Sequence, residues 1–390
     1  MLAHSPPLPL VIDYNGDITA EDEAAIFLAL EQRDRVRRIR FYLPVLNLQK
    51  LIMAIDGEYS ILEYLILWVP GVPAEGKSTV LILPETFQTL HLRVLVLECS
   101  IPMRFPLLGT AAGLVTLNLG LYHPSTYFQP TFLLQPLSSM PQLEILMISF
   151  YFAVPNRVVE RQLMRTPITT HATLPNLRVF ALQAVSAYSE AVFSRITAPR
   201  LDNLLIDYYN QIGFSVPQLL QFIGRTENLR FDRAEFDFKS EHVSVQVNTP
   251  GTNVSIPAFV IGIDCWHLDW QVSSMAQISN ALSPIFSAVE HLTLKHRLHD
   301  RSSEEHNEVD RTEWRKLLRS FSNVKTFRID DGIIKELSRS LPLEDGEHPL
   351  EILPELQELT YPGRSIIDDG FTSFIGARQN AGRPVTLIKS

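Results

Sequence analysis

The sequence is poor in cysteine and has no long uninterrupted run of apolar residues. Its two cysteines, Cys99 and Cys265, lie in or beside strand-like apolar runs. We therefore expect two buried free thiols rather than a disulfide framework, which favours a reducing compartment, the cytoplasm or the nucleus. No stretch reaches the roughly 20 apolar residues that a membrane-spanning helix needs. The proline-rich start also lacks the basic residues of a signal peptide.

Motifs of catalysis and cofactor binding are missing as well. The chain contains no G-x-S-x-G nucleophile elbow, no glycine-rich phosphate loop and no H-E-x-x-H zinc motif. Its 17 glycines are few for a nucleotide-binding fold. Histidines occur near both cysteines in the sequence, but that proximity does not establish the geometry of a catalytic pair. We expect no enzyme, no catalytic residue, no metal and no cofactor.

The chain has no excess of positive charge. It carries 34 basic and 43 acidic residues, a net charge of −9, so nothing attracts it generally to nucleic acid or anionic lipid. The one basic run, at residues 33–40, is interleaved with Val36 and Ile39 and is preceded by acidic residues. We expect that run to form a solvated edge between a helix and a strand. Neither nucleic acid nor a membrane is an expected partner.

A charged segment at residues 295–310 holds the densest group of candidate metal ligands. These are His296, His299, Glu304, Glu305 and His306. Metal ligands need a rigid element and hydrogen-bonding partners that orient them, and this segment has no apolar period that would place it on a helix or strand. A solvated loop is the favoured prediction. The less favoured alternative is a metal site, or an enzyme built on these histidines.

What the sequence has is a recurring strand motif of the form apolar-x-x-apolar-x-apolar. Its copies begin at Leu62, Leu92, Leu114, Leu143, Leu177, Leu201, Val289, Val324 and Leu356. Most copies follow a Pro or Ser two to three residues earlier. Such a strand cannot bury its apolar side alone and needs a neighbouring copy to stack on. The motif therefore predicts an architecture built for binding.

Helical patterns alternate with these strands. The first covers residues 17–32, with Thr19 as the expected N-cap. Others are expected at residues 47–55, 131–139, 186–196, 216–224, 273–282, 310–321, 333–341 and 370–380. A helix–turn–strand unit repeated in one direction gives parallel strands with helices on the outside. The predicted fold is α/β, an irregular leucine-rich-repeat solenoid, or horseshoe, with its parallel sheet on the concave side.

The spacing of the motifs shows that the array is irregular. Leu92 and Leu114 are 22 residues apart, whereas Leu143 and Leu177 are 34 apart, and the Asn that usually follows the strand of such repeats is missing. The expected organisation is a short tail at 1–16 and a single degenerate repeat domain at 17–390. The register is faintest at 231–270, where VSVQV and FVIGID flank a turn at 249–252. That stretch is either a hairpin-like insertion or two weakly written repeats.

These strings resemble the leucine-rich-repeat part of the F-box-like protein families of mushroom-forming fungi. The resemblance is carried by AEDEAAIFLALEQRDRVRRIRF, TLPNLRVF and TAPRLDNLLI, and most specifically by DRTEWRKLLRSFSNVKTFRI with LPELQELTY and FTSFIGARQNAGRPVTL. It implies a ubiquitin-ligase adaptor whose repeats hold a protein substrate. Residues 1–16 are too few for an F-box. Either the start lies downstream of one, or this is a repeat-only paralogue without a ligase link.

Strand positions that face away from the helices are the candidate partner-binding residues, because strand side chains alternate. Aromatic residues just past two strands are added as anchors for a protein partner. The set is Tyr64, Ile66, Val94, Val96, Asn118, Met147, Phe150, Tyr151, Phe152, Asn203, Tyr208, Tyr209, His291 and Arg328. Since parallel strands are often buried on both sides, coverage of this face by the chain's own loops remains an alternative.

The expected function is that of a non-enzymatic, monomeric protein-interaction module. We expect it to serve as the substrate-recognition part of an F-box-type ubiquitin-ligase adaptor, with an unidentified protein substrate as partner. A ligase adaptor is a further partner only if an upstream F-box exists. The alternative is a repeat-only scaffold or signalling protein with no ligase connection.

Overall fold

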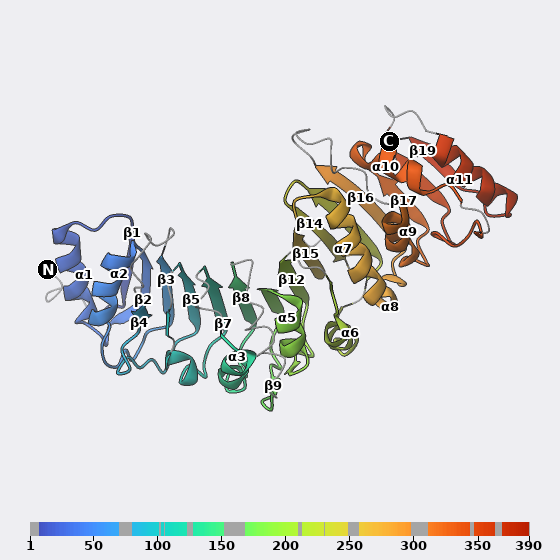
Figure 1. Ribbon diagram of the computed structural model, residues 1–390. Helices are drawn as coiled ribbons and strands as arrows, with labels where there is room; N and C mark the ends of the chain where they lie inside the picture. The colour runs from blue at the N-terminus through green and yellow to red at the C-terminus, as the bar shows by residue number, and fades with distance from the viewer. Residues whose placement is uncertain are drawn as a thin grey trace. The chain divides into compact units, whose positions relative to one another are not determined.

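The computed structural model describes residues 8–69, 80–100, 103–104, 106–122, 128–151, 168–209, 213–229, 231–248, 257–297, 311–343, 347–362 and 369–389. Its strands are mostly parallel and alternate with helices along the chain, which confirms the α/β class (Figure 1). The chain divides into two compact units, Met1–Leu201 (unit 1) and Asp202–Ser390 (unit 2). Among the described residues, no helix is long and apolar enough to cross a membrane.

Unit 1 has one parallel sheet in the order β1-β2-β3-β5-β7-β8-β10. Its strands are β1 (Leu10–Asn15), β2 (Val36–Tyr42), β3 (Tyr64–Val69), β5 (Val94–Cys99), β7 (Thr116–Leu121), β8 (Ile145–Phe150) and β10 (Val179–Ala184). Its helices are α1 (Ala20–Leu30), α2 (Val45–Ala54), η2 (Pro106–Gly109), α3 (Pro130–Leu137) and α5 (Ser186–Phe193). Two small pairs join β4 (Leu81–Ile82) to β6 (Met103–Arg104), and β9 (Ala172–Thr173) to β11 (Ile196–Thr197).

Alternating burial follows the strand motif. In β5, Leu95 and Leu97 are fully buried on the helix side, while Val94 and Val96 are half-buried on the other side. The same alternation recurs in β3, β8 and β10. The start of α1 also follows the sequence, because the Thr19 side chain accepts the backbone N–H of Asp22 and the Asp22 carboxylate accepts that of Thr19.

The tail expected at residues 1–16 contains a strand instead. Residues 10–15 form β1, which pairs with β2 in parallel. Its sequence LVIDYN alternates, with Ile12 buried and Val11 exposed. This alternating segment is too short and too polar to match the leucine motif. It nevertheless forms one edge of the sheet.

Unit 2 has a mixed sheet in the order β12-β15-β14-β13-β16-β17-β18-β19. Its strands are β12 (Asn203–Tyr209), β13 (Arg233–Lys239), β14 (His242–Asn248), β15 (Phe259–Asp264), β16 (His291–Arg297), β17 (Thr326–Ile329), β18 (Glu358–Tyr361) and β19 (Thr386–Lys389). Its helices are α6 (Pro217–Gly224), α7 (Leu268–Ala281), α8 (Ser283–Phe286), α9 (Arg311–Arg319), α10 (Asp331–Ser340) and α11 (Asp369–Asn380).

The irregular stretch at 231–270 contains three strands. They lie in the sheet in the order β15-β14-β13, the reverse of their order in the chain. The two strands expected there are β14 and β15, and they pair antiparallel. A third strand, β13, precedes them and forms a hairpin with β14. Because β15 pairs with β12 on its other side, the hairpin lies between β15 and β16. The turn expected at 249–252 lies outside the described residues.

The first residues of the charged loop expected at 295–310 belong to a strand. Residues 295–297 complete β16. The His296 side chain is partly buried and its ring lies against Gly332 of α10, where an added Cβ would overlap it. Burial lowers the pKa of His296. The chain thus continues the strand through residues that lack the apolar motif. Residues 298–310, with the remaining histidines and carboxylates of the candidate metal group, lie outside the described residues.

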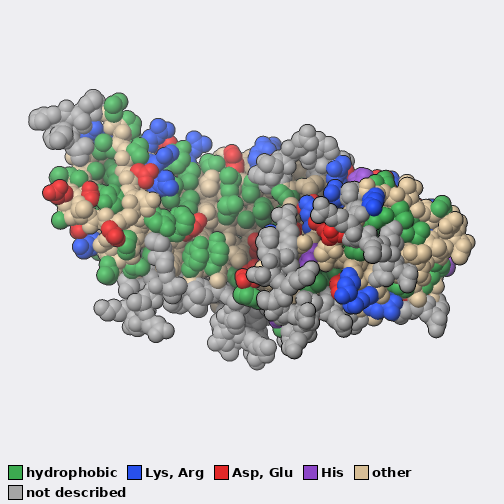
Figure 2. Space-filling model, turned by 90° about the horizontal axis from the view of Figure 1, so that it is seen from above, with side chains coloured by type: hydrophobic (Ala, Val, Ile, Leu, Met, Phe, Trp, Pro, Cys, Tyr) green, Lys and Arg blue, Asp and Glu red, His purple; other side chains and the backbone are tan. Residues whose placement is uncertain are grey.

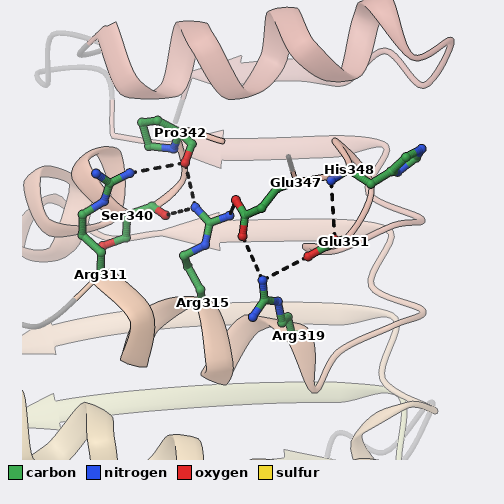
Figure 3. A network of polar contacts seen from close by, with 8 residues as sticks. All are labelled: Arg311, Arg315, Arg319, Ser340, Pro342, Glu347, His348 and Glu351. Atoms are coloured by element: carbon green, nitrogen blue, oxygen red, sulfur yellow. Dashed lines mark hydrogen bonds and ion pairs between the residues drawn. The ribbon is translucent and has the colours of Figure 1, made fainter. Parts of the chain in front are cut away.

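Arginines of α9 hold the segment that follows α10. Arg315 is almost fully buried and donates to the carbonyls of Ser340 (3.0 Å) and Pro342 (2.7 Å) and to Glu347. Figure 3 shows these contacts together with Arg319, which bridges Glu347 and Glu351 at 3.0 Å each. The network fixes the path of the chain from α10 to β18.

Candidate binding faces

The half-exposed face of unit 1 is the side of its sheet that lies opposite the buried leucines. Strand register arranges its side chains in three rows across the sheet. The first row is Val11, Arg38, Tyr64, Val94, Thr116, Ile145 and Val179. The second is Asp13, Arg40, Ile66, Val96, Asn118, Met147 and Ala181. The third is Asn15, Tyr42, Trp68, Glu98, Gly120, Ser149 and Gln183.

Six of the sequence-predicted residues lie together in the first two rows. They are Tyr64, Ile66, Val94, Val96, Asn118 and Met147, and each is partly exposed. From β3 to β10 these two rows are almost entirely apolar or aromatic. In Figure 2, hydrophobic side chains are numerous on the left of the view, where the N-terminal strands lie, with Lys and Arg side chains among them. An apolar surface of this kind lowers its free energy when a partner covers it.

Of the aromatic residues predicted past the strand ends that the structure describes, Tyr151 alone is exposed. It is 44% exposed and stacks on Tyr122, with ring centroids 4.0 Å apart. Phe150 is buried and packs edge-on against Tyr188 at 5.1 Å, so its prediction as a partner anchor is wrong. β8 extends through Phe150, and the alternation of the strand turns this side chain toward the core. Phe152 lies outside the described residues.

Tyr208 and Tyr209 of unit 2, also predicted as partner anchors, lie within a strand rather than past its end. β12 runs to Tyr209, and both rings are buried, with exposed fractions of 0% and 3%. Tyr208 packs against Phe214 at 5.7 Å. Both side chains therefore stabilise the interior of unit 2 and are not available to a partner.

Two aromatic residues that the motif did not flag lie on the half-exposed face of unit 1. Trp68 is 40% exposed, and Tyr42 packs edge-on against it at 4.6 Å. Trp68 stands two residues after Ile66, so extending the strand alternation by one step would have found it. With Tyr122 and Tyr151, these rings line the carboxyl-terminal ends of the strands.

The basic run at residues 33–40 supplies the charged margin of this face. The Arg38 guanidinium lies 4.6 Å from the ring centre of Tyr64, a cation–π arrangement. Arg40 pairs with Asp13 at 3.5 Å. Arg37 pairs with Glu63 at 2.9 Å, off the face, and that contact raises the pKa of Arg37. These three arginines thus each have a contact within the chain, and the solvated edge stays a prediction.

The corresponding face of unit 2 is polar. Of the residues predicted there, Asn203 donates its side-chain amide to the Pro257 carbonyl at 2.9 Å, which is a structural contact. His291 contacts the Thr326 hydroxyl through Nδ1 at 2.7 Å. Arg328 is exposed and is the register partner of Thr293 and Thr360. The structure brings His291 and Arg328 to neighbouring strands, but within a polar surrounding.

Asp207, His242 and Asp264 form a polar cluster over Gly262 that the sequence patterns did not reveal. His242 Nδ1 lies 3.0 Å from Asp264 Oδ1. A Cβ on Gly262 would overlap both the Asp207 carboxylate and the His242 ring, so the glycine makes the cluster possible. Burial and the nearby charge of Asp264 raise the pKa of Asp207, while His242 opposes this. The strands come together only through the reversed order of β14 and β15.

Neither cysteine has the surroundings of a nucleophile. Both side chains are buried and neither forms a disulfide, and burial raises the pKa of Cys99 to about 12 and also raises that of Cys265. A thiol in such surroundings stays protonated and unreactive. Within the described ranges, no three His, Cys, Asp or Glu side chains are arranged to hold a metal ion.

Comparisons with known proteins add no family assignment. No protein-family model matches the chain, and no curated protein is similar to it.

Proposed function

We propose that this chain is a non-enzymatic protein-interaction module of the leucine-rich-repeat type. Support for a repeat comes from a hydrogen-bond pattern that recurs at the start of successive strands. The Glu63 carbonyl accepts the N–H groups of both Arg93 and Val94, and the Arg93 carbonyl accepts those of Val115 and Thr116. In unit 2 the Glu290 carbonyl does the same for the two residues at the start of β17.

A side-chain contact also recurs in equivalent positions of the motif. Asn176, directly before Leu177, donates to the Pro141 carbonyl of the preceding copy at 3.0 Å. Asn323, directly before Val324, donates in the same way to Ser287 at 2.7 Å. Identical contacts between successive copies favour a stacked array, in which each copy is stabilised by its neighbour.

The observation that carries the binding role is the half-exposed apolar face of unit 1. Parallel strands that are covered on both sides have both sets of side chains buried. Here the set containing Tyr64, Ile66, Val94 and Val96 keeps partial exposure, while the opposite set is fully buried. A partner protein that covers this face would bury apolar and aromatic side chains of the kinds that dominate protein interfaces.

The partner proposed from the family resemblance is a protein substrate held for ubiquitin transfer. In this role the repeats recognise the substrate by surface complementarity, and an F-box segment attaches the chain to its ligase. The alternative, a repeat-only scaffold, uses the same face without the ligase.

Affinity purification with three versions of the chain tests both levels of this proposal. We compare wild type, Val96→Glu on the half-exposed face and Leu46→Glu, which changes a 71% exposed residue on α2. Wild type and Leu46→Glu should recover the same partner protein, and Val96→Glu should lose it while keeping its melting temperature. Equal recovery by all three versions would refute binding through this face. The ligase role is tested on a version extended by any in-frame segment encoded upstream of Met1, and absence of the ligase adaptor subunit from its eluate would refute that role and leave the scaffold.

A further inference from the structure

One carboxylate interrupts the uncharged surface of the half-exposed face. Among the described positions on this face from β3 to β10, Glu98 alone carries a charge at neutral pH. Its register neighbours are Trp68 on β3 and Gly120 on β7. A carboxylate on an apolar protein surface costs free energy through lost hydration unless a donor or a cation compensates it. The charge of Glu98 therefore needs a hydrogen-bond donor or a cation.

Among the residues that the structure describes, Glu98 has a neutral hydrogen-bond partner but no cation. Its carboxylate accepts a hydrogen bond from the side chain of Asn118, which lowers its pKa, but burial is the larger effect and the pKa is raised overall. No described Lys or Arg forms an ion pair with it. The side chain lies over Gly120, because a Cβ there would come 2.9 Å from Glu98 Cγ. The absence of a side chain at Gly120 makes room for the Glu98 side chain itself.

Aromatic rings stand on two sides of this carboxylate. Trp68 is the adjacent residue on β3 and is 40% exposed. Tyr122 follows β7, and burial, then the Tyr151 hydroxyl and last the charge of Glu98 raise the pKa of its phenol. Tyr151 stacks on Tyr122 and fixes its ring. A carboxylate with aromatic residues on its neighbouring strands has the chemistry that binds a guanidinium or ammonium group, by an ion pair and cation–π contact together.

We propose that Glu98, Trp68 and Tyr122 bind an arginine or lysine side chain of the protein partner, flanked by apolar residues that cover Ile66, Val96 and Met147. This deepens the proposed function, on which it rests, by specifying the chemistry of the partner. Charge complementarity selects the cation, since its binding compensates the one charge of an otherwise uncharged surface.

A random dodecapeptide display library on the immobilised full chain tests this assignment. Selection is run on wild type, on Glu98→Gln, and on Glu144→Gln as a matched control, because Glu144 is exposed at the amino-terminal edge of the sheet. Wild type and Glu144→Gln should enrich peptides with Arg or Lys beside apolar residues. Glu98→Gln should not enrich the basic residue. Enrichment of acidic or uncharged peptides by wild type would overturn the proposal.

A double-mutant cycle on one synthetic peptide from the wild-type selection then locates the contact. Glu98→Gln should raise Kd by about tenfold or more, and so should replacement of the peptide's basic residue by Gln. The two changes together should weaken it little further, because they remove the same contact. Additive effects would overturn the assignment. If Val96→Glu abolishes peptide binding and Glu98→Gln leaves it unchanged, this inference alone is contradicted. If Val96→Glu leaves peptide binding unchanged, the proposed function is contradicted.

Discussion

Buried arginines stabilise the segments that lead into the last strands of unit 2. Arg378 of α11 is 0% exposed and donates to the carbonyls of Ile352 (3.2 Å), Pro354 (3.0 Å) and Leu356 (3.2 Å). Burial and the nearby Arg383 lower its pKa. A planar guanidinium with five donors suits this task, because it satisfies several carbonyls of an irregular segment at once.

Arg378→Met should therefore destabilise the chain by about 3 kcal/mol, since buried carbonyls lose their donor while the apolar volume is kept. Arg383→Met is the matched control. Arg383 is exposed and forms one ion pair with Glu355 at 3.2 Å, so its loss should cost at most about 1 kcal/mol. Urea denaturation of both variants measures the difference. Equal and small effects would show that the Arg378 contacts do not stabilise this segment.

Glu98 gives a pH dependence of stability with a definite sign. Its pKa is raised in the folded state, so folding favours the protonated form, and this contribution to stability is lost as pH rises through the folded pKa. The stability of Glu98→Gln relative to wild type should then increase from acidic to neutral pH. Thermal melts at several pH values measure it. A Glu98→Gln variant that loses stability relative to wild type over this range contradicts the stated environment.

Alternation along a strand predicts the sides of side chains but not where the strand ends. Within the motif it placed Tyr64 and Val96 correctly on the half-exposed face. Past the motif it failed for Phe150 and Tyr208, because the strands continue through them and bury their rings. Trp68 and Glu98 were missed because the motif ends before them. Their proximity to Tyr122 depends on register between strands, which no single strand encodes.

At the scale of elements, α10 and α11 approach so closely that only glycine fits at the contact. A Cβ on Gly370 would overlap the backbone carbonyl of Ser338. Backbone cannot move aside as a side-chain tip can. In the same helix, Gly376 has no atom within 4 Å of the corresponding Cβ position.

Gly370→Ala and Gly376→Ala should consequently have opposite effects. Alanine favours a helix over glycine by up to about 1 kcal/mol, and Gly376→Ala should gain part of this. Gly370→Ala should instead lose about 2 kcal/mol through overpacking against α10. Chemical denaturation of the two variants compares them directly. Stabilisation by both would mean that α10 and α11 are further apart than described.

Helices were predictable from apolar spacing, and the hairpin β13–β14 was not. Helix α2 follows from Leu48, Leu51 and Ile52, which are all buried as the spacing requires. β13 alternates through buried Ala234 and Phe236, but it lacks the leucine motif and carries charges between them. Its pairing depends on insertion between β15 and β16, a long-range arrangement that local patterns do not contain.

At the scale of the molecule, the two units present faces of different chemistry. From β3 to β10, unit 1 offers rows dominated by apolar and aromatic residues, in which Glu98 is the one described carboxylate. Unit 2 offers hydrogen-bonded polar groups such as His291 and the cluster around His242. Apolar burial supplies most of the free energy of protein association, and polar contacts supply specificity. We therefore propose the half-exposed face of unit 1 as the principal surface for a partner.

Site-specific photo-crosslinking in cells tests that claim most directly. A benzophenone amino acid is placed at Val96 or Met147 on the half-exposed face, or at Leu46 on α2 as the control. We expect one discrete crosslinked product from Val96 and the same one from Met147, lost on introducing Glu98→Gln, and none from Leu46. A crosslinked partner protein obtained from Leu46 alone, with none from Val96 or Met147, would contradict binding through the half-exposed face.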